Sequence, residues 1–172
     1  IDIDFYGNYS NRGTLYLDED CDIWNSENLI IYGHHMASSA MFGDLDYFAS
    51  ESYWEEHKYI QFDTIYEEQT YEIVAAFYAH ILYQNEEGFR YYQFIEADDE
   101  ATFNEYVDFI AENQCYDTGV DIEYGDRLLT LSTCAYQVEN GRFAVVAKLV
   151  TDDDEDTAAA EESAAPETSA PT

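Results

Sequence analysis

Short apolar runs separated by polar turns dominate this chain, and most are rich in the β-branched and aromatic residues that favour strands. Strands are predicted over residues 28–32, 59–63, 127–133 and 142–150, with a shorter strand over 14–18. Residues 71–82 are expected to form one long strand or two short ones, and residues 89–95 favour a strand. The pattern therefore predicts a mainly β protein.

Apolar residues three or four positions apart interrupt this β pattern in two places. They predict a helix over residues 38–49, with a further helical turn over 52–57. The clearest helix is predicted over 98–113, because acidic residues occupy its first turn, where they complement the helix dipole. Its apolar residues share one face: Phe103, Tyr106, Val107 and Ile110. Many strands with inserted helices predict a β-barrel or an α+β domain.

The chain has 172 residues, which suits one domain rather than two. Residues 1–150 form the predicted domain. Residues 151–172 form an acidic tail rich in Ala, Pro, Ser and Thr, which we expect to be disordered because it has no aromatic residue and no apolar periodicity. Ile1 begins within sequence typical of a folded domain, so we expect the natural N-terminus to have been removed.

The charge narrows the possible partners. The sequence has 38 acidic residues against 6 basic ones, for a formal net charge of −32. A surface of this sign repels phosphate backbones and anionic lipids, so nucleic-acid binding is not expected. The acids are consistent either with simple solubility or with attraction of a cationic partner such as an amine. The sequence has no apolar run of about 18 residues, the length that a membrane span needs.

Three reactive side chains come at the ends of predicted strands: His34, Cys134 and Arg142. The turn signal Asn140-Gly141 predicts a hairpin that brings Cys134 and Arg142 to the same end of the sheet. A thiol, an imidazole and a guanidinium can together attack an amide and stabilise the oxyanion. Each residue alone has an ordinary structural explanation, and only the combination points to catalysis. This chemistry needs no metal or cofactor, and the three cysteines lack C-x-x-C spacing, which argues against a zinc ribbon.

These motifs resemble those of class B sortases. The histidine region is Asn28-Leu-Ile-Ile-Tyr-Gly-His-His-Met36 with Ala40-Met-Phe-Gly43, and the cysteine region is Leu129-Thr-Leu-Ser-Thr-Cys-Ala-Tyr136. Lys58-Tyr-Ile-Gln-Phe-Asp-Thr64, Arg142 and the helix over 98–113 also match the family, so the resemblance covers nearly all of residues 1–150. It implies a sortase-like β-barrel that here lacks the family's N-terminal membrane helix and first elements.

The resemblance also implies a function. Such enzymes of Gram-positive bacteria are extracytoplasmic and membrane-anchored, and they anchor surface proteins to the cell wall. They cut a sorting signal of the Asn-Pro-x-Thr-x type after its threonine and transfer the acyl group to a peptidoglycan amine. Cys134 would be the nucleophile, His34 the acid and base, and Arg142 the substrate and oxyanion clamp. Substrate contacts are expected from the neighbours of the nucleophile: Ser132, Thr133 and Ala135. A thiol hydrolase and a catalytically silent binding domain remain alternatives.

Overall fold

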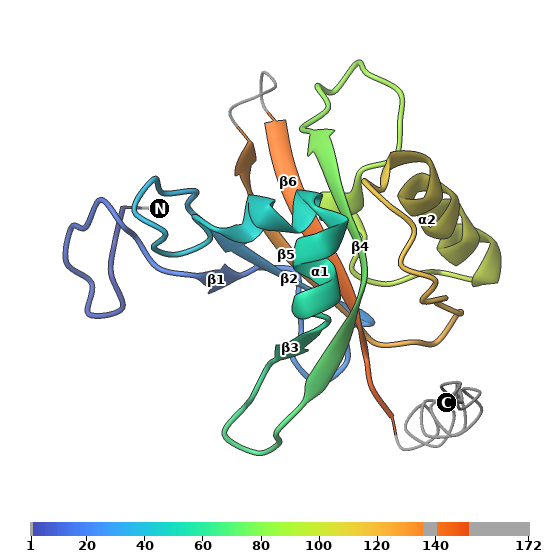
Figure 1. Ribbon diagram of the computed structural model, residues 1–172, viewed down its shortest axis with the longest axis horizontal. Helices are drawn as coiled ribbons and strands as arrows, with labels where there is room; N and C mark the ends of the chain where they lie inside the picture. The colour runs from blue at the N-terminus through green and yellow to red at the C-terminus, as the bar shows by residue number, and fades with distance from the viewer. Residues whose placement is uncertain (1, 136–140, 152–172) are drawn as a thin grey trace, which may run out of the picture.

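A six-stranded, strongly curled sheet forms the body of the protein (Figure 1). The computed structural model describes residues 2–135 and 141–151. The strands lie in the order β1-β2-β5-β6-β4-β3, and within the described residues β1 and β3 form the two edges. Their bounds are β1 (Tyr16–Leu17), β2 (Asn28–Gly33), β3 (Tyr59–Gln61), β4 (Thr70–His80), β5 (Leu128–Ala135) and β6 (Gly141–Leu149). The predicted mainly β class with inserted helices is confirmed, as an open half-barrel.

The central strands β4, β5 and β6 are covered on both faces, which explains their nearly continuous apolar sequences. Alternate residues of β6 join different clusters, because successive side chains of a strand point to opposite faces. Ala144 and Val146 pack on the side of helix α2 (Glu100–Asn113). Phe143 and Val145 pack on the side of the 3-10 turn η1 (Leu45–Ala49) and of helix α1 (Glu51–Glu56). Figure 1 labels α1 on this side of the sheet.

Helix α2 begins where its sequence predicts. The side chain of Asp99 accepts a hydrogen bond from the backbone N–H of Thr102 at 2.8 Å, which caps the first turn. That hydrogen bond also lowers the pKa of Asp99. Phe103, Tyr106 and Ile110 are buried on the face towards the sheet. The predicted helix over 98–113 is therefore confirmed, and it covers one face of the sheet.

Two predicted elements are wrong. Residues 89–95 do not form a strand but contain the 3-10 turn η2 (Tyr91–Gln93), whose aromatic neighbours pack between the sheet and α2. The region 38–49 is helical only in η1, because Ser39 and Met41 adopt positive φ values of 57° and 55°. A Cβ at Gly43 would collide with the backbone oxygen of Met36, so the chain turns too tightly here for a helix.

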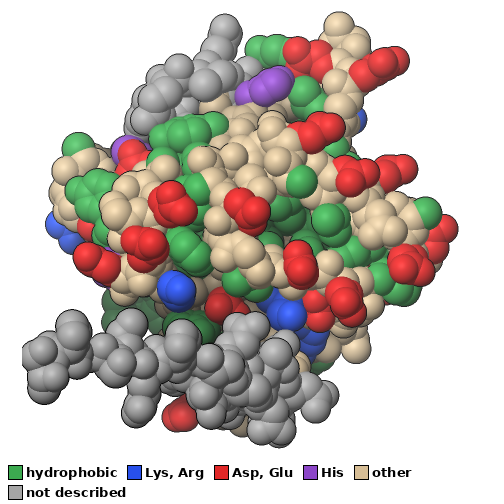
Figure 2. All heavy atoms as spheres, turned by 45° about the vertical axis from the view of Figure 1, so that its right-hand side comes forward, with side chains coloured by type: hydrophobic (Ala, Val, Ile, Leu, Met, Phe, Trp, Pro, Cys, Tyr) green, Lys and Arg blue, Asp and Glu red, His purple; other side chains and the backbone are tan. Residues whose placement is uncertain are grey.

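The remaining predictions hold where the structure describes them. The region predicted over residues 71–82 forms one long strand, β4, which ends at His80, and β5 pairs antiparallel with β6 as a hairpin. Residues 136–140 of the connecting loop and residues 152–172 of the predicted acidic tail lie outside the described residues. On the face shown in Figure 2, Asp and Glu side chains are spread widely and far outnumber Lys and Arg. This distribution agrees with the excess of acidic residues in the sequence.

Candidate active site

The strand register brings the three predicted reactive residues together. Cys134 of β5 lies directly opposite Arg142 of β6. On the other side of β5, Gly33 of β2 pairs with Thr133 in a parallel ladder, so His34 and Cys134 are the next residues of two adjacent strands. Neighbouring strands lie about 4.8 Å apart, so the three residues form one row across the end of the sheet.

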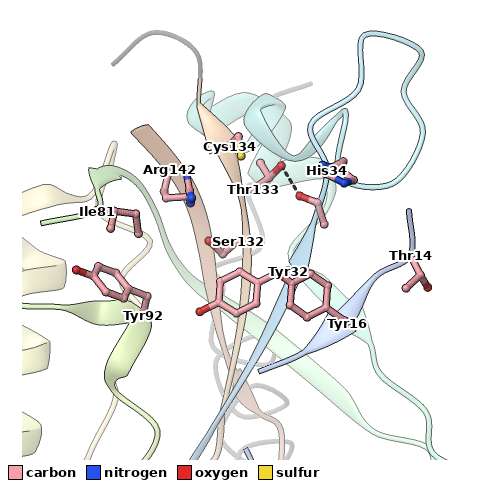
Figure 3. A pocket seen from close by; sticks show the side chains of 11 residues that line it. Thr14, Tyr16, Tyr32, His34, Ile81, Tyr92, Ser132, Thr133, Cys134 and Arg142 are labelled. Carbon is pink, nitrogen blue, oxygen red and sulfur yellow. Dashed lines mark hydrogen bonds between the residues drawn. The ribbon is translucent and has the colours of Figure 1, made fainter. Parts of the chain in front are cut away.

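That row borders a single cavity of about 400 Å³. His34, Cys134 and Arg142 all line it, and Cys134 lies between the other two in Figure 3. The other lining residues are Thr14, Tyr16, Tyr32, Gly33, Ile81, Tyr92, Ser132 and Thr133. The three residues singled out from the sequence therefore share one pocket rather than separate faces of the protein.

Arg142 supplies a fixed positive charge at one end of the row. Its Nη1 donates a hydrogen bond to the backbone oxygen of Gly141 at 3.0 Å, and its side chain is half-buried. Among residues 2–135 and 141–151, no carboxylate lies within ion-pair distance of this guanidinium. The remaining N–H groups of Arg142 can therefore meet a negative charge that develops in the pocket.

His34 lies at the other end of the row, where β2 ends. Its Nε2 is 3.9 Å from Oδ1 of Asp2, a contact between two substantially exposed side chains. Such an exposed pair stabilises the fold little, because water screens it. With 37% of its side chain exposed, the imidazole can exchange protons with solvent as well as with groups in the pocket.

The turn after His34 is built closely around it. The backbone oxygen of His34 accepts a hydrogen bond from the N–H of Phe42 at 3.1 Å. The Phe42 ring covers Gly33, where a Cβ would overlap that ring and the Leu15 side chain. Glycine is therefore needed immediately before the histidine because the turn folds back onto the strand.

The second histidine of the pair, His35, lies outside the pocket. Its Nε2 is 3.3 Å from Oδ2 of Asp46 in η1, and both side chains are largely covered. His35 does not line the pocket that holds Cys134. We therefore interpret His35 as a neighbour that fixes the turn, which agrees with the choice of His34 as the reactive imidazole.

The residues expected to contact substrate already have partners in the protein. The Ser132 hydroxyl and the Tyr91 hydroxyl are hydrogen-bonded at 3.0 Å, and both residues are buried. Thr133 Oγ1 donates to the backbone oxygen of Gly33 at 2.8 Å, the bond drawn in Figure 3. Ala135 pairs with Gly141 through the backbone, and its side chain lies outside the described residues. Ser132 and Thr133 line the pocket, whereas their hydroxyls also lock neighbouring elements together.

Sequence reasoning missed the tyrosines of the pocket. Tyr16 pairs with Tyr32 across β1 and β2, and their ring centroids are 5.3 Å apart. Tyr92 enters from η2 on the Arg142 side (Figure 3). Period-two alternation offered one signal, because Tyr32 is two residues before His34 and must point to the same face. The pairing partner and η2 could not be read from that alternation.

Burial raises the pKa of three tyrosines in and beside the pocket, Tyr16, Tyr32 and Tyr91. Burial and then the nearby Asp18 carboxylate raise the pKa of Tyr32 and of Tyr16 above the ordinary value. Burial also raises the pKa of Tyr91 to about 12, although its bond to Ser132 and the charge of Arg142 act in the opposite direction. The tyrosines therefore supply neutral hydroxyls and ring faces rather than charges.

Other reactive groups are separate from this pocket. Cys21 and Cys115 are free thiols, and burial raises the pKa of both. Within the described part of the chain, no group of three His, Cys, Asp or Glu side chains is arranged to bind a metal ion. No helix among the same residues is long and apolar enough to span a bilayer.

Several known proteins are similar to this chain in sequence and in fold. A model of the sortase domain matches residues 6–150. Sortase B of Staphylococcus aureus is 27% identical over 153 residues, and sortase B of Listeria monocytogenes is 29% identical over 159 residues. The solved S. aureus sortase B–substrate complex superposes with a TM-score of 0.76 at 26% identity, covering 88% of this chain and 68% of that one. A sortase B structure complexed with triglycine gives a TM-score of 0.75 at 27% identity, covering 88% of this chain and 69% of that one.

The matches cover most of this chain but only part of its relatives. Each of the two relatives matches 87% of this chain, but the chain spans only 60% and 62% of their lengths. The family model, in contrast, covers most of the described sheet and every residue of the row that lines the pocket. The chain therefore belongs to the sortase family, and its similarity within that family is to class B.

Proposed function

We propose that residues 1–150 are the catalytic domain of a cysteine transpeptidase that cuts a sorting signal and transfers the acyl part to an amine. The observation that carries this proposal is the placement of Cys134 between His34 and Arg142 in one cavity. Family membership supports it, because the sortase-domain match over residues 6–150 includes all three residues. The acidic residues from 151 onwards are proposed to be a tail outside the catalytic domain.

The proposed reaction begins with a thiolate at Cys134. A free cysteine has a pKa of about 8.5, so nearby positive charge is needed to increase its reactive fraction. The thiolate attacks the carbonyl carbon of the signal's threonine, and the carbonyl oxygen becomes negatively charged. Arg142 then stabilises that oxygen, and His34 protonates the leaving amine as the C–N bond breaks. The product of this half-reaction is a thioester on Cys134.

An amine completes the transfer. It attacks the thioester carbon, a new C–N bond forms, and Cys134 leaves. His34, neutral after the first half-reaction, accepts a proton from the attacking nitrogen. We propose a peptidoglycan amine as the acceptor and a peptide of the Asn-Pro-x-Thr-x type as the donor. Solved sortase B relatives bound to a substrate and to triglycine support both classes of ligand.

Three residues beside the nucleophile are proposed to contact the signal peptide: Ser132, Thr133 and Ala135. Ser132 supports this best, because it lines the pocket and its hydroxyl is hydrogen-bonded to that of buried Tyr91. The pair has two hydroxyl protons and uses one between them, so one remains to donate to a peptide oxygen. Thr133 contributes mainly by fixing β2 against β5 through Gly33.

The location of the enzyme is also a proposal. The two relatives come from Gram-positive bacteria, which supports action at the cell surface on wall-anchored proteins. Attachment to the membrane would come from a segment N-terminal to the domain, as in the family.

Cleavage of a quenched fluorescent Asn-Pro-x-Thr-x peptide tests the proposal. The protein should cleave it after threonine, and Cys134→Ala should abolish cleavage. Cys115→Ala is the matched control, because that thiol lies outside the pocket and should be dispensable. Mass spectrometry with triglycine present distinguishes amide transfer from hydrolysis. Cleavage that survives Cys134→Ala would refute the proposed nucleophile.

A further inference from the structure

Two hollows meet beside helix α2, separate from the catalytic pocket. One, of about 360 Å³, lies between the helix and Phe89, and the other, of about 300 Å³, continues from Phe89 to the end of β4. The two hollows share four lining residues: Gly88, Phe89, Phe109 and Glu112. We call the two hollows together the α2 groove. None of the residues that line the groove also lines the catalytic pocket.

The floor of the α2 groove is apolar and rests on the core. Phe89 and Phe109, which line both hollows, stack with their ring centroids 5.2 Å apart. Both residues are half-buried, and each packs on a buried ring, Phe89 on Tyr106 at 5.5 Å and Phe109 on Phe77 at 5.3 Å. Three further apolar residues extend the lining towards β4: Tyr78, Ala79 and Leu82. An apolar side chain of a ligand can therefore pack here against a surface that is already formed.

The loop that leaves β4 and forms one wall of the groove is fixed in shape. Nη2 of Arg90 donates to the backbone oxygens of Tyr83 and Glu86 at 3.1 and 3.0 Å. The backbone N–H of Tyr83 donates to Oε2 of Glu86 at 2.6 Å, and that of Leu82 donates to the Tyr92 hydroxyl at 3.2 Å. These bonds hold the loop beside α2, and they direct Nη2 of Arg90 to the loop backbone.

Carboxylates border the apolar floor. Glu105, Asp108 and Glu112 are exposed and lie three and four positions apart, so they share one face of α2, and like charges at these spacings destabilise a helix. Glu87 lines the groove from the loop. Neither α2 nor residues 82–89 contain a Lys or Arg, and no ion pair among the described residues involves these four carboxylates. Figure 2 turns the α2 side forward, and carboxylates lie there among apolar side chains.

We propose that the α2 groove is a docking surface for a basic peptide segment of a partner protein. Lys or Arg side chains of the segment would meet the carboxylates of α2, and an apolar side chain would lie on the stacked rings of Phe89 and Phe109. The charge of the protein selects this occupant. At a formal net charge of −32, a second copy of the chain would be repelled, and so would a nucleic acid or an anionic membrane.

The binding of two synthetic peptides tests the docking surface. The first probe consists of three repeats of Lys-Lys-Phe, and the second has Ser in place of each Phe. At 0.15 M salt, where exposed charges more than about 8 Å apart are largely screened, fluorescence anisotropy should show the Phe probe binding at least about tenfold more tightly than the Ser probe. The triple variant Glu105→Gln, Asp108→Asn and Glu112→Gln should weaken binding of the Phe probe by about tenfold, because each exposed ion pair contributes up to a few-fold.

The matched control removes the same charge from the other face of the sheet. Glu51→Gln, Glu55→Gln and Glu56→Gln change three exposed carboxylates of α1, and binding of the Phe probe should weaken by less than about twofold. Equal losses in the two triple variants, or equal affinities of the two probes for the parent, would show only general charge attraction and would overturn the docking surface. Absence of binding by the parent would overturn it as well.

Two further measurements separate this proposal from its neighbours. If the parent self-associates in sedimentation and the α2 variant does not, the groove binds a second copy and the proposed partner is wrong. Cleavage of the signal peptide should be the same in both triple variants as in the parent, because none of the six residues lines the catalytic pocket. A failure of docking would therefore leave the proposed transpeptidase standing, and a failure of cleavage would leave the docking surface standing.

Discussion

Cys134 is brought beside Arg142 at one junction of two strands and beside His34 at another, and these two junctions are built in different ways. Arg142 reaches it through the β5–β6 hairpin, in which the paired residues are only eight positions apart in the sequence. His34 reaches it through the parallel β2–β5 ladder, whose partners are 100 positions apart. The first junction is local and the second depends on the whole fold, although both end in the same pocket.

This difference predicts that changes at the first junction affect mainly the reaction, whereas changes at the second affect the stability of the fold as well. The Cys134–Arg142 pair needs little more than the hairpin register, so changes there should affect the reaction and leave the fold intact. The Cys134–His34 pair needs β2 to lie correctly against β5, which depends on contacts such as Thr133 with Gly33 and Asn28 with Thr130. Changes along that ladder should therefore alter stability and the alignment of the imidazole together.

The largest effect is expected at the local junction, from Arg142→Lys. A lysine keeps the charge but loses the planar fork of donors that can meet an oxyanion and a second oxygen at once. Loss of one oxyanion donor typically reduces kcat by about 100- to 1,000-fold, and we expect a reduction of this size. Steady-state cleavage of the signal peptide measures it, while thermal unfolding should show a melting temperature close to that of the parent.

Arg127→Lys controls for the loss of a guanidinium. Arg127 precedes β5 at its other end and donates to the backbone oxygen of Ile23 at 3.1 Å, away from the pocket. Its replacement should leave kcat within about twofold of the parent value. An Arg142→Lys protein with kcat in that same range would show that the guanidinium is not the oxyanion clamp.

A smaller but broader effect is expected at the long-range junction, from Gly33→Ala. The added Cβ would overlap Leu15 and the Phe42 ring, so the turn that follows β2 must shift. Overpacking of this kind costs about 1–3 kcal/mol of unfolding free energy. Because Phe42 is also hydrogen-bonded to His34, we expect the imidazole to move and kcat/KM to fall by about tenfold or more. Urea unfolding and peptide cleavage give the two values.

A second substitution can make room for the methyl group. Phe42→Ala removes both ring atoms of Phe42 that the new Cβ would meet, so the double variant should lose less stability and activity than the sum of the two single variants. Strictly additive losses in stability and in activity would mean that the clash is not what displaces His34.

The sequence predicted the local junction of the site for a clear physical reason. Asn140-Gly141 is a strong turn signal, and a hairpin near it brings Cys134 and Arg142 to the same end of the sheet without knowledge of the rest of the fold. Their direct pairing could not be predicted from that signal, because Gly141 already belongs to β6, opposite Ala135. The position of His34 followed only from the family resemblance, because no local rule pairs residues 33 and 133. The tyrosines of the pocket were missed since β1 and η2 approach from regions distant in sequence.

The two wrong elements show where local patterns are ambiguous. Met41, Leu45 and Phe48 have helical spacing, but positive φ values at Ser39 and Met41 interrupt the helix so that the turn can close onto His34. Residues 89–95 are rich in aromatic residues, a composition that fits any half-buried surface. Here that surface is the gap between the sheet and α2, in which Tyr91 and Phe94 are buried on and beside a 3-10 turn.

The smallest effect is expected from Thr133→Val, which removes one hydrogen bond of the long-range junction. Valine has nearly the same shape and favours strands, so only the 2.8 Å bond to the Gly33 carbonyl is lost. The expected cost is about 1 kcal/mol, which lowers the melting temperature by about 2–4 °C in a protein of this size. Because the bond lies one residue from both His34 and Cys134, kcat/KM should also fall by a few-fold.

Thr130→Val removes the comparable bond at the far end of the same ladder. Thr130 donates to the side chain of buried Asn28 at 2.9 Å, so this variant leaves a buried acceptor without that donor and should cost at least as much stability. Its kcat/KM, measured well below its melting temperature, should nevertheless match that of the parent, because the pocket end of the ladder keeps its bond. If Thr130→Val reduced activity as much as Thr133→Val, the ladder would act on His34 only through overall stability, and the distinction between the two junctions would not hold.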